Sequence, residues 1–336
     1  MSSDNRPLVT IAVPVYKRMH FLPNALRSVA AQDYPNIELL VSDNGENGPE
    51  LQDLVSEHYP RPFSLRRNDA TVSMSRHFNQ LVEEATGDFF VLLCDDDEIA
   101  PGFVSRLAEV LAGDPQIGVV VPYVELMNES GGPVTDAEAR DLPYSRLDPD
   151  RLPPSVSSCL EFVRLWVDGQ HQFVSFVTTM ARTREVIERG GYPDVPTGDD
   201  DAVALRLALG RKVAFCREAV LRLRAYGASE GLAMSPRELA SDIKSWLSFL
   251  DSDPAFRALA AENPHEWSEI RRLMREKAWR TYRHRWKTMY RARLPYAEWV
   301  RAGFALPFIP EYYRWLSRYL ARDGLSRAKN LVRGRA

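Results

Sequence analysis

The chain has 336 residues, of which 45% are hydrophobic and 26% charged, with only three cysteines. This composition is that of a globular protein, and it excludes a disordered, collagen-like or disulfide-stapled chain. The cysteines are far apart and form no Cys-x-x-Cys pair, which indicates reduced core residues rather than a zinc site. No apolar stretch reaches the roughly 18–20 residues that span a bilayer, and the polar start lacks the apolar core of a signal peptide. We therefore expect a cytoplasmic protein that is at most peripheral to a membrane.

The net charge of −3 is the sum of two opposed segments. Residues 265–336 carry 18 Lys and Arg against six Asp and Glu, whereas residues 1–264 carry 25 against 40. Five of the seven tryptophans also lie after residue 264. This asymmetry indicates that the two segments face different partners.

The first part of the chain alternates the patterns of strands and helices. Strands are expected at Leu8–Val15, Ile37–Ser42, Asp88–Cys94 and Ile117–Val124. Helices are expected at Phe21–Gln32, Pro49–His58, Ser73–Ala85 and Gly102–Ala112. Because continuous apolar strands separated by helices imply a sheet covered on both faces, the fold class is α/β and doubly wound.

The second part begins with a segment rich in Gly, Pro, Asp and Ser, residues 128–155, which indicates a surface loop. Further helices are expected at Ser158–Val167, Arg184–Arg189 and Asp201–Leu209. Further strands are expected at Phe173–Ala181, Val213–Cys216 and Val220–Arg224, the last two as short edge strands. Beyond Pro236 the pattern is helical almost to the end of the chain.

Acidic residues follow two of the expected strands. Asp95, Asp96 and Asp97 come directly after the third strand, and Asp43 follows the second. Ligands of open α/β sheets bind at the carboxyl ends of strands, where three adjacent carboxylates would repel one another without a cation. Hard oxygen ligands of this kind favour Mg²⁺ or Mn²⁺. The alternative is a solvated acidic turn before the next helix, and a later triplet, Asp199–Asp201, has the alternative role of a helix N-cap.

Four segments in this order resemble family 2 glycosyltransferases, which have the GT-A fold. They are Val9–Arg18, Asn79–Asp88, Leu93–Asp97, and Gly190–Tyr192 followed by Gly198–Asp200 and Leu205–Leu207. The resemblance covers roughly residues 8–230. It implies a GT-A catalytic domain over residues 1–235, with a nucleotide-sugar half at 1–125 and an acceptor half at 126–235. Residues 236–336 would form a basic, aromatic, helical C-terminal region.

The resemblance implies an inverting transfer of a sugar from a nucleotide-diphosphate sugar to an acceptor hydroxyl, assisted by Mn²⁺ or Mg²⁺, in cell-surface polysaccharide or glycolipid synthesis. A UDP-sugar is the favoured donor, with GDP- or dTDP-sugars as alternatives, and the acceptor would be a saccharide or lipid-linked. The implied residues are Asp200 as catalytic base, Asp97 and Asp95 at the metal, and Pro14, Val15, Tyr16, Asp43, Arg76, Asp95 and Asp96 at the nucleotide sugar. A carboxylate base of this kind typically contributes about 10²–10⁴-fold to the rate.

Two departures from the family pattern support an alternative. Cys94 replaces the usual first Asp before the metal-binding carboxylates, and Tyr226 stands where relatives often carry a His metal ligand. They motivate a non-catalytic GT-A scaffold or carbohydrate-binding protein. Other enzyme classes lack their motifs, since the chain has no Gly-x-Gly-x-x-Gly, P-loop or Gly-x-Ser-x-Gly sequence in the required place.

The basic C-terminal segment contains an apolar stripe at helical spacing. Its members are Trp267, Ile270, Met274, Ala278, Tyr282, Trp286 and Met289. Two interpretations remain open: the stripe packs on the catalytic domain, or residues 265–336 bind an anionic membrane surface through aromatic and basic side chains. No nucleic-acid recognition motif accompanies the basic residues, so a nucleic-acid partner is not expected.

Overall fold

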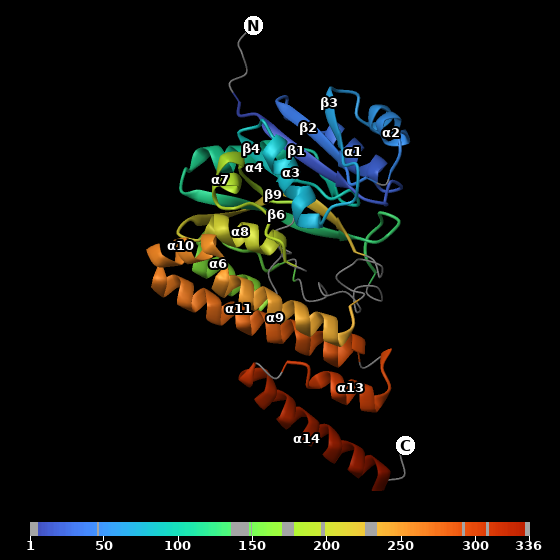
Figure 1. Ribbon diagram of the computed structural model, residues 1–336, viewed down its shortest axis with the longest axis vertical. Coiled ribbons are helices and arrows are strands. Elements are labelled where there is room, and N and C mark those ends of the chain that lie inside the picture. The colour runs from blue at the N-terminus through green and yellow to red at the C-terminus, as the bar shows by residue number, and fades with distance from the viewer. Residues whose placement is uncertain are drawn as a thin grey trace.

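The computed structural model describes residues 6–45, 47–135, 148, 150–169, 178–195, 199–225, 234–290, 293–306 and 309–332. A nine-stranded sheet forms the centre of this part of the chain, and helices lie on both of its faces (Figure 1). The last helices extend to the end of the molecule opposite α1 and α2. Among the described residues, none of the helices has the length and apolarity needed to cross a bilayer.

The sheet has the order β3-β2-β1-β4-β8-β6-β9-β5, and β7 pairs with β9. Its strands are β1 Val9–Val15, β2 Ile37–Asp43, β3 Phe63–Arg67, β4 Phe89–Leu92, β5 Glu98–Ile99, β6 Ile117–Met127, β7 Val156–Ser158, β8 Met180–Arg182 and β9 Lys212–Arg224. The first four in spatial order are parallel, β8 is antiparallel to both neighbours, and β6 and β9 are again parallel. The predicted fold class, a mixed and mainly parallel sheet between helices, is confirmed.

Helices follow most of the strands. Those of the sheet region are α1 Leu22–Ala30, α2 Glu50–His58, α3 Met74–Glu84, α4 Phe103–Gly113, α6 Cys159–Asp168, α7 Thr183–Glu188 and α8 Asp199–Ala208. The C-terminal ones are α9 Pro236–Ser252, α10 Pro254–Glu262, α11 Pro264–Arg285, the π-helical turn η2 Trp286–Tyr290, α13 Tyr296–Gly303 and α14 Pro310–Val332. A capping box between Ser235 and Glu238 fixes the start of α9, and prolines begin α9, α10 and α11.

The structure corrects part of the predicted strand pattern. The two edge strands expected at Val213–Cys216 and Val220–Arg224 are one strand, β9, which pairs with β6 and β5 and has an irregularity between Cys216 and Val220. That irregularity interrupts the apolar run and makes one strand resemble two. The expected strand at Phe173–Ala181 is described only from its end, as β8, and most of the expected loop 128–155 lies outside the described residues.

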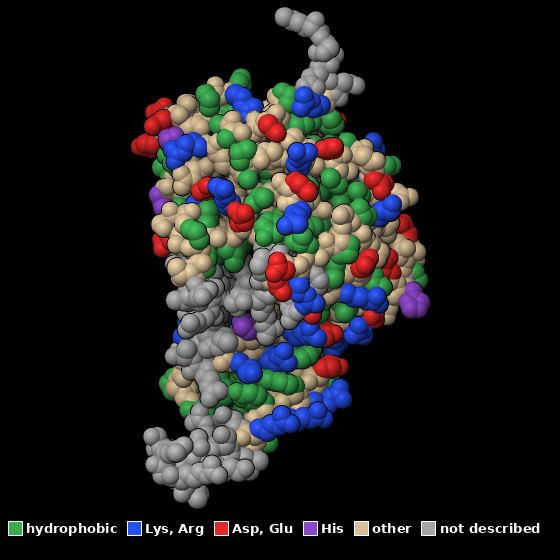
Figure 2. All heavy atoms as spheres, turned by 180° about the vertical axis from the view of Figure 1, so that it is seen from behind, with side chains coloured by type: hydrophobic (Ala, Val, Ile, Leu, Met, Phe, Trp, Pro, Cys, Tyr) green, Lys and Arg blue, Asp and Glu red, His purple; other side chains and the backbone are tan. Residues whose placement is uncertain are grey.

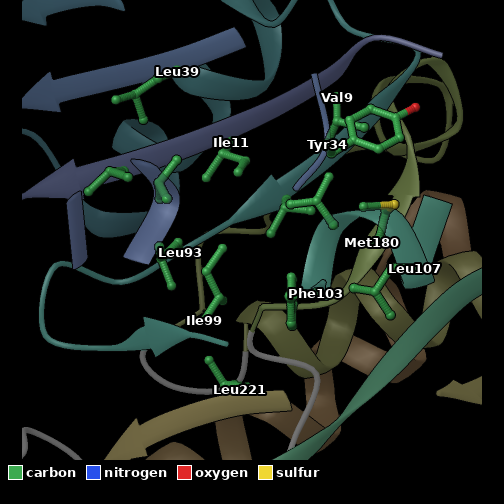
Figure 3. Packing of buried hydrophobic residues seen from close by; sticks show 14 of the residues in the cluster. Val9, Ile11, Tyr34, Leu39, Leu93, Ile99, Phe103, Leu107, Met180 and Leu221 are labelled. Carbon is green, nitrogen blue, oxygen red and sulfur yellow. The ribbon is translucent and has the colours of Figure 1, made fainter. Parts of the chain in front are cut away.

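One hydrophobic cluster fills the face of the sheet under α1, α2 and α4. Figure 3 shows Ile11 of β1 and Leu221 of β9 on either side of Phe103 and Leu107, which come from α4. All four side chains are buried. Because α4 packs against both halves of the sheet, this cluster joins the strands before and after the antiparallel β8.

A second cluster covers the opposite face and crosses from the sheet region into the C-terminal helices. It contains residues of α3, α6 and α8 together with Leu250, Phe256, Ile270 and Met274. The predicted division of the chain at residue 235 therefore separates segments that share a core. The interpretation that the C-terminal stripe packs on the sheet region accounts for Ile270 and Met274.

A third cluster lies among η2, α11, α13 and α14. Its centre is a stacked pair, Trp286 and Trp299, with ring centroids 4.3 Å apart. Each indole N–H donates to the backbone carbonyl of the other residue, at 2.7 and 2.8 Å. Tyr282 and Trp286 are fully buried, so this part of the stripe is also used in packing.

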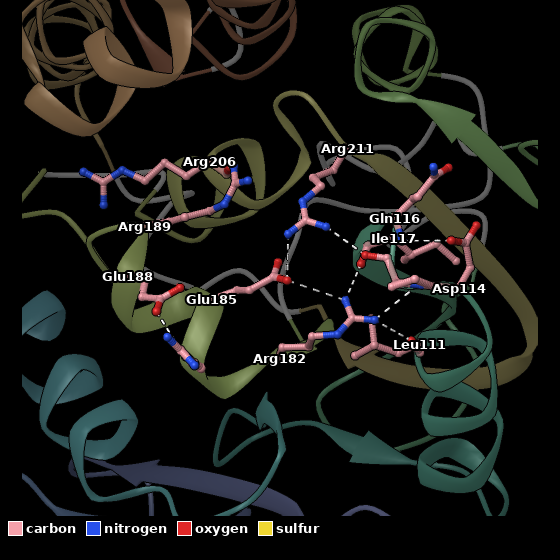
Figure 4. Close-up of polar contacts among 12 residues, drawn as sticks. Leu111, Asp114, Gln116, Ile117, Arg182, Glu185, Glu188, Arg189, Arg206 and Arg211 are labelled. Carbon is pink, nitrogen blue, oxygen red and sulfur yellow. Dashed lines mark hydrogen bonds and ion pairs between the residues drawn. The ribbon is translucent and has the colours of Figure 1, made fainter. Parts of the chain in front are cut away.

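Arg182, at the end of the antiparallel strand β8, ties that strand to its surroundings. Its guanidinium donates to the carbonyls of Leu111 and Ile117 at 2.7 and 2.6 Å, which close the turn between α4 and β6 (Figure 4). Arg211 and Arg182 both approach Glu185, at 2.9 and 3.8 Å. The segment that contains β8 and α7 is thus held to the sheet by polar contacts as well as by its apolar residues.

Candidate active site

The carboxyl ends of β1, β2 and β4 meet at one edge of the sheet. Parallel pairing sets Val15 beside Asp43 and Ala12 beside Leu92. The backbone N–H of Tyr16, directly after β1, donates to the Asp95 carboxylate at 3.3 Å. Acidic residues after two different strands therefore reach the same edge, where ligands of open α/β sheets bind.

Asp43 is fully buried and organises the loop that follows β2. One carboxylate oxygen accepts from the backbone N–H of Gly45 at 3.1 Å and from the side chain of Asn47 at 2.8 Å. The other accepts from Arg67 Nε at 3.1 Å. Gly45 has a φ of +91°, a conformation that a residue with a Cβ rarely adopts, so the turn suits glycine. Asp43, which the sequence predicts as a nucleotide-binding residue, thus stabilises the loop after β2 in this structure.

Asp95 lies against Arg18, a residue from the segment just after β1. The guanidinium is 2.8 Å from Asp95 and 2.6 Å from Asp96. Burial raises the pKa of Asp95 to about 7, while the charge of Arg18 acts in the opposite direction. Arg18 is thus a cation from the chain itself that offsets the repulsion among the adjacent carboxylates.

Asp97 is directed toward β9 instead. It is buried and accepts from the backbone N–H of Arg224 at 2.9 Å. The guanidinium of Arg224 donates to the Asp96 carbonyl at 2.8 Å and pairs with Glu98 at 3.0 Å. Burial raises the pKa of Asp97, and the nearby Asp96 adds to that effect. The acidic turn after β4 is therefore clamped between Arg18 on one side and Arg224 on the other.

Three potential ligand atoms in this turn lie within 4.8 Å of one another: the sulfur of Cys94 and carboxylate oxygens of Asp96 and Asp97. Two carboxylates fit a hard cation such as Mg²⁺ or Mn²⁺. The thiol fits less well, because burial and the neighbouring aspartates raise the pKa of Cys94 and favour the protonated form. Among the described residues the structure thus groups Asp97 with Asp96, while Arg18 pairs with both Asp96 and Asp95, the other predicted ligand.

The remaining predicted nucleotide-binding residues occupy two places. Pro14 and Val15 lie in β1, and Tyr16 follows them with the Lys17 ammonium 4.6 Å from its ring centroid. Arg76 is exposed on α3 and lines a hollow of about 690 Å³ that also includes Ser75, Asn79, Tyr192 and Asp194.

The proposed base, Asp200, is the second residue of α8 and is half-buried. Residues 190–192, which precede α8 in the chain, are anchored from two sides. Asn79 on α3 donates to the Tyr192 carbonyl at 2.7 Å and accepts from its N–H at 2.8 Å. Arg206 on α8 donates to the carbonyls of Gly190 and Gly191 at 2.8 and 2.7 Å. A Cβ on Gly191 would lie 2.3 Å from the Asn79 side chain, so this close approach requires glycine.

Three arginines at this edge have no role in the sequence-based prediction: Arg18, Arg67 and Arg224. Each contacts an aspartate that the sequence does single out. Arg18 and Arg224 stand within or beside motif segments, which is the one signal that could have identified them. Tyr226 and Gly198 lie outside the described residues.

The comparison with known families agrees with this geometry. The pattern described as "Glycosyl transferase family 2" matches residues 10–160, which include β1, β2, β4 and the acidic turn. Over this segment, the chain is similar to glycosyl transferase family 2. The match contains Asp43 and Asp95–Asp97 and ends before the loop that holds Tyr192.

Curated relatives match about a third of the chain. The putative colanic acid biosynthesis glycosyl transferase WcaA of Escherichia coli is 30% identical over 114 residues, which are 34% of this chain and 40% of that protein. The abequosyltransferase RfbV of Salmonella typhimurium is 29% identical over 114 residues, or 33% and 34% of the two chains. The alignments with the curated relatives span less than half of their length.

Solved structures match nearly the whole chain. The structure of Staphylococcus aureus TarS 1-349 in complex with UDP-GlcNAc covers 92% of this chain and 83% of its own, with a TM-score of 0.62 and 14% identity. The mannosyltransferase PcManGT from Pyrobaculum calidifontis, in complex with GDP-Man and Mn²⁺, covers 94% and 84%, with a TM-score of 0.53 and 18% identity. At such identities the likeness concerns the fold, and the GT-A fold expected from the sequence is confirmed.

Proposed function

We propose that the chain is a glycosyltransferase that moves a sugar from a nucleotide-diphosphate sugar to an acceptor hydroxyl, with inversion at the sugar. The observation that carries this proposal is the meeting of β1, β2 and β4 at one edge, with Asp43 at the end of β2 and the acidic turn Asp95–Asp97 after β4 on either side of β1. This is the edge at which an α/β sheet holds a nucleotide. The family match over residues 10–160 supports the same conclusion.

The donor's base and ribose would lie against Pro14, Val15, Tyr16 and Asp43, and its diphosphate against the acidic turn. Two carboxylates, Asp96 and Asp97, would hold a divalent cation together with phosphate oxygens. When bound, Mg²⁺ or Mn²⁺ stabilises the negative charge of the departing diphosphate. Asp95, predicted as a metal ligand and a contact to the nucleotide sugar, would reach the donor from the same turn and also position Arg18 and the Tyr16 backbone. Arg76 is proposed as a further contact to the donor.

Asp200 is proposed as the base that accepts the proton of the attacking hydroxyl. Asn79 and Arg206 fasten Tyr192 and Gly191, which precede α8 in the chain, and Arg206 itself belongs to the helix that carries Asp200. A base acts only when it lies within hydrogen-bond reach of the reacting proton, which makes such anchoring useful.

We propose a UDP-sugar as the first donor to test, because neighbours in fold are complexes with UDP and UDP-GlcNAc. A GDP-sugar is the next, since another neighbour is a complex with GDP-Man and Mn²⁺. For the acceptor we propose a cell-surface glycan or its lipid-linked precursor, because relatives include a colanic acid biosynthesis enzyme and a glucosyltransferase named for an undecaprenol-linked substrate.

The test is donor binding and turnover with purified protein. Thermal shift across UDP-, GDP- and dTDP-sugars with Mn²⁺ or Mg²⁺ should give one stabilising donor, because a ligand that binds only the folded state raises its stability. Asp97→Ala should abolish the part of the donor-induced thermal shift that depends on the metal. Asp200→Asn should keep donor binding while turnover falls by about 10²-fold or more. Asp33→Asn, an exposed control, should change neither. If no donor binds, or if both variants match the wild type, the chain is a non-catalytic scaffold of the same fold.

We further propose that the last two helices contact an anionic membrane. Among the described residues, Tyr296, Phe304 and Tyr313 are large hydrophobic side chains that stay at least 41% exposed, and all three lie at α13 or α14. Arg301, Arg314 and Arg318 are exposed in the same helices, and Figure 2 shows Lys and Arg side chains gathered over the C-terminal part of the molecule. Aromatic and basic side chains together suit the interface of an anionic bilayer.

A further inference from the structure

A pocket of about 250 Å³ lies between the sheet region and the C-terminal helices. Its walls come from α6, α8, α9 and α11, through residues that include Trp166, Asp201, Asp242, Trp246, Lys277 and Arg285. The pocket is close to the lower end of the roughly 300–1,000 Å³ of sites for drug-sized ligands, so it suits a single small unit rather than a long chain.

Arg285 supplies hydrogen-bond donors without acceptors. Its Nε and Nη1 atoms are buried and have no hydrogen-bond partner among the described residues. A buried guanidinium donor without a partner is costly, and the fork of such donors matches the oxygens of a phosphate or carboxylate. The guanidinium also neighbours the Tyr290 hydroxyl, whose pKa it lowers against the larger effect of burial.

Lys277 connects this pocket with the start of α8. Its ammonium is 3.4 Å from the Asp201 carboxylate and 3.2 Å from the centroid of the Trp166 ring. Burial lowers the pKa of Lys277, and the charges of Asp201 and Asp200 oppose that effect. Asp200, the proposed base, is therefore within electrostatic reach of a residue that lines the pocket.

The other walls suit a carbohydrate. Trp166 and Trp246 offer apolar indole surface, on which the C–H groups of a sugar ring can pack. Thr281 and Asp242 add groups that can exchange hydrogen bonds with sugar hydroxyls. Burial, with Glu238 nearby, raises the pKa of Asp242.

We propose that this pocket binds one sugar unit of the acceptor through an oxyanion, a phosphate or a carboxylate, that the sugar carries. The proposal rests on the proposed function. The oxyanion would pair with Arg285, and the ring would pack against the two indoles, so that the acceptor is held next to the start of α8. The acceptor would then be an anionic saccharide rather than a neutral one.

Isothermal titration calorimetry of the full chain tests this with glucose 6-phosphate and glucuronate, against glucose and inorganic phosphate. We expect at least one of the anionic sugars to bind more tightly than either control, and the stronger of the two identifies the oxyanion. Arg285→Gln should weaken that binding roughly 10- to 100-fold, as expected for loss of a charged hydrogen bond. Arg275→Gln, an exposed arginine on the same helix, should leave it unchanged. If Arg285→Gln does not fold, Arg285→Lys keeps the charge without the fork and should weaken binding severalfold.

Three results would overturn the proposal: no binding of either anionic sugar, equal binding of glucose or of inorganic phosphate, or unchanged binding in the folded Arg285 variant. Donor hydrolysis by the wild-type protein is measured alongside. If the donor is hydrolysed and no anionic sugar binds, the pocket proposal fails and the enzyme remains. If anionic sugars bind and no donor does, the proposed function fails and the oxyanion site remains.

Discussion

The Asn79 side chain forms hydrogen bonds with both backbone polar groups of Tyr192, which lies 113 residues later in the chain. One carboxamide donates to the Tyr192 carbonyl and accepts from its N–H, so it pairs with the loop as a neighbouring strand would. The Phe78 ring packs edge-on against the Tyr192 ring at 5.2 Å. The proposed nucleotide half and acceptor half of the chain are thus joined by two hydrogen bonds between one side chain and one backbone residue.

Asn79→Ala should destabilise the protein because it leaves both groups of Tyr192 without their partner. We expect the free energy of unfolding to fall by about 1–3 kcal/mol in urea titrations. Glu83→Ala, an exposed change on the same helix, should alter it by no more than about 0.5 kcal/mol. Equal effects of the two substitutions would show that the contact does not stabilise the fold.

Arg206 should be one of the most sensitive positions in the chain. It is 3% exposed, its guanidinium lies over the rings of Phe249 and Phe256, and it pairs with Asp253 at 2.8 Å. Arg206→Met should lower the free energy of unfolding by roughly 3–5 kcal/mol, because it leaves the largely buried Asp253 carboxylate without its charge partner. Arg222→Met, which breaks an exposed pair with Glu125, should cost about 1 kcal/mol or less. Comparable losses of stability in the two variants, measured by thermal or chemical unfolding, would contradict this ranking.

Gly118 should not tolerate a side chain. A Cβ at this position in β6 would lie 1.9 Å from the carbonyl oxygen of Leu207 on α8, so the helix or the strand would have to move. Gly118→Ala is expected to lower the free energy of unfolding by about 1–3 kcal/mol or more. Gly113→Ala is the matched control, since a Cβ there meets nothing within 4 Å, and it should be neutral or slightly stabilising. A neutral Gly118→Ala would refute the close packing of α8 on β6.

His77 should make stability depend on pH. It is buried on α3 with Nε2 2.8 Å from the Ser42 hydroxyl, and burial lowers its pKa to about 4. Because the pKa is lower in the folded state than in the unfolded state, the unfolded state binds the proton first as the pH falls. The stability that neutral His77 provides is therefore present above pH 6.5 and is lost between about pH 6.5 and pH 4.

The corresponding experiment compares urea unfolding of the wild type and of His77→Gln at pH 7 and pH 5. From the pKa shift of His77 alone, the free energy of unfolding of the wild type should fall by about 2 kcal/mol more than that of the variant between pH 7 and pH 5. The difference between the two proteins removes the contributions of all other titrating groups. Parallel pH dependences would mean that His77 titrates normally.

Membrane contact by α13 and α14 predicts salt-sensitive binding to vesicles. Sedimentation with anionic lipid vesicles should capture the wild type, and capture should weaken as ionic strength rises. The double variant Phe304→Ser, Tyr313→Ser should bind severalfold less, because it removes exposed aromatic surface. Ile187→Ser, which removes an even more exposed hydrophobic side chain on α7, should bind like the wild type. Equal capture by vesicles of neutral lipid would contradict contact with an anionic membrane.

The sequence is sufficient to predict elements whose residues face a core on one or both sides. Strands β1, β2 and β4 are continuous apolar runs, and α3 repeats its apolar residues at helical spacing. The edge strand β3 is different, because Phe63–Arg67 is largely half-exposed and polar at every second position or more. Its pairing with β2 depends on the sheet already being there, so local pattern does not predict it.

At the site, the sequence is enough to find the carboxylates but not their partners. The acidic turn is visible as three consecutive aspartates after an apolar run. That Asp95 pairs with Arg18 and Asp97 with Arg224 depends on contacts between residues 77 and 127 positions apart. Such contacts follow from the order of strands in the sheet, which no local pattern fixes. The same holds for the pocket at Arg285, whose walls come from four helices.

The seven tryptophans all follow residue 165 and divide between two of the three clusters. Trp166, Trp246 and Trp267 pack in or against the second cluster, while the other four belong to or pack against the third. No tryptophan therefore lies in β1, β2 or β4 itself, although the second cluster also contains residues of these three strands. A sugar bound between Trp166 and Trp246 should change the intrinsic fluorescence directly, because both indoles line that pocket. Tryptophan emission thus offers a readout of binding at the Arg285 pocket that needs no added label.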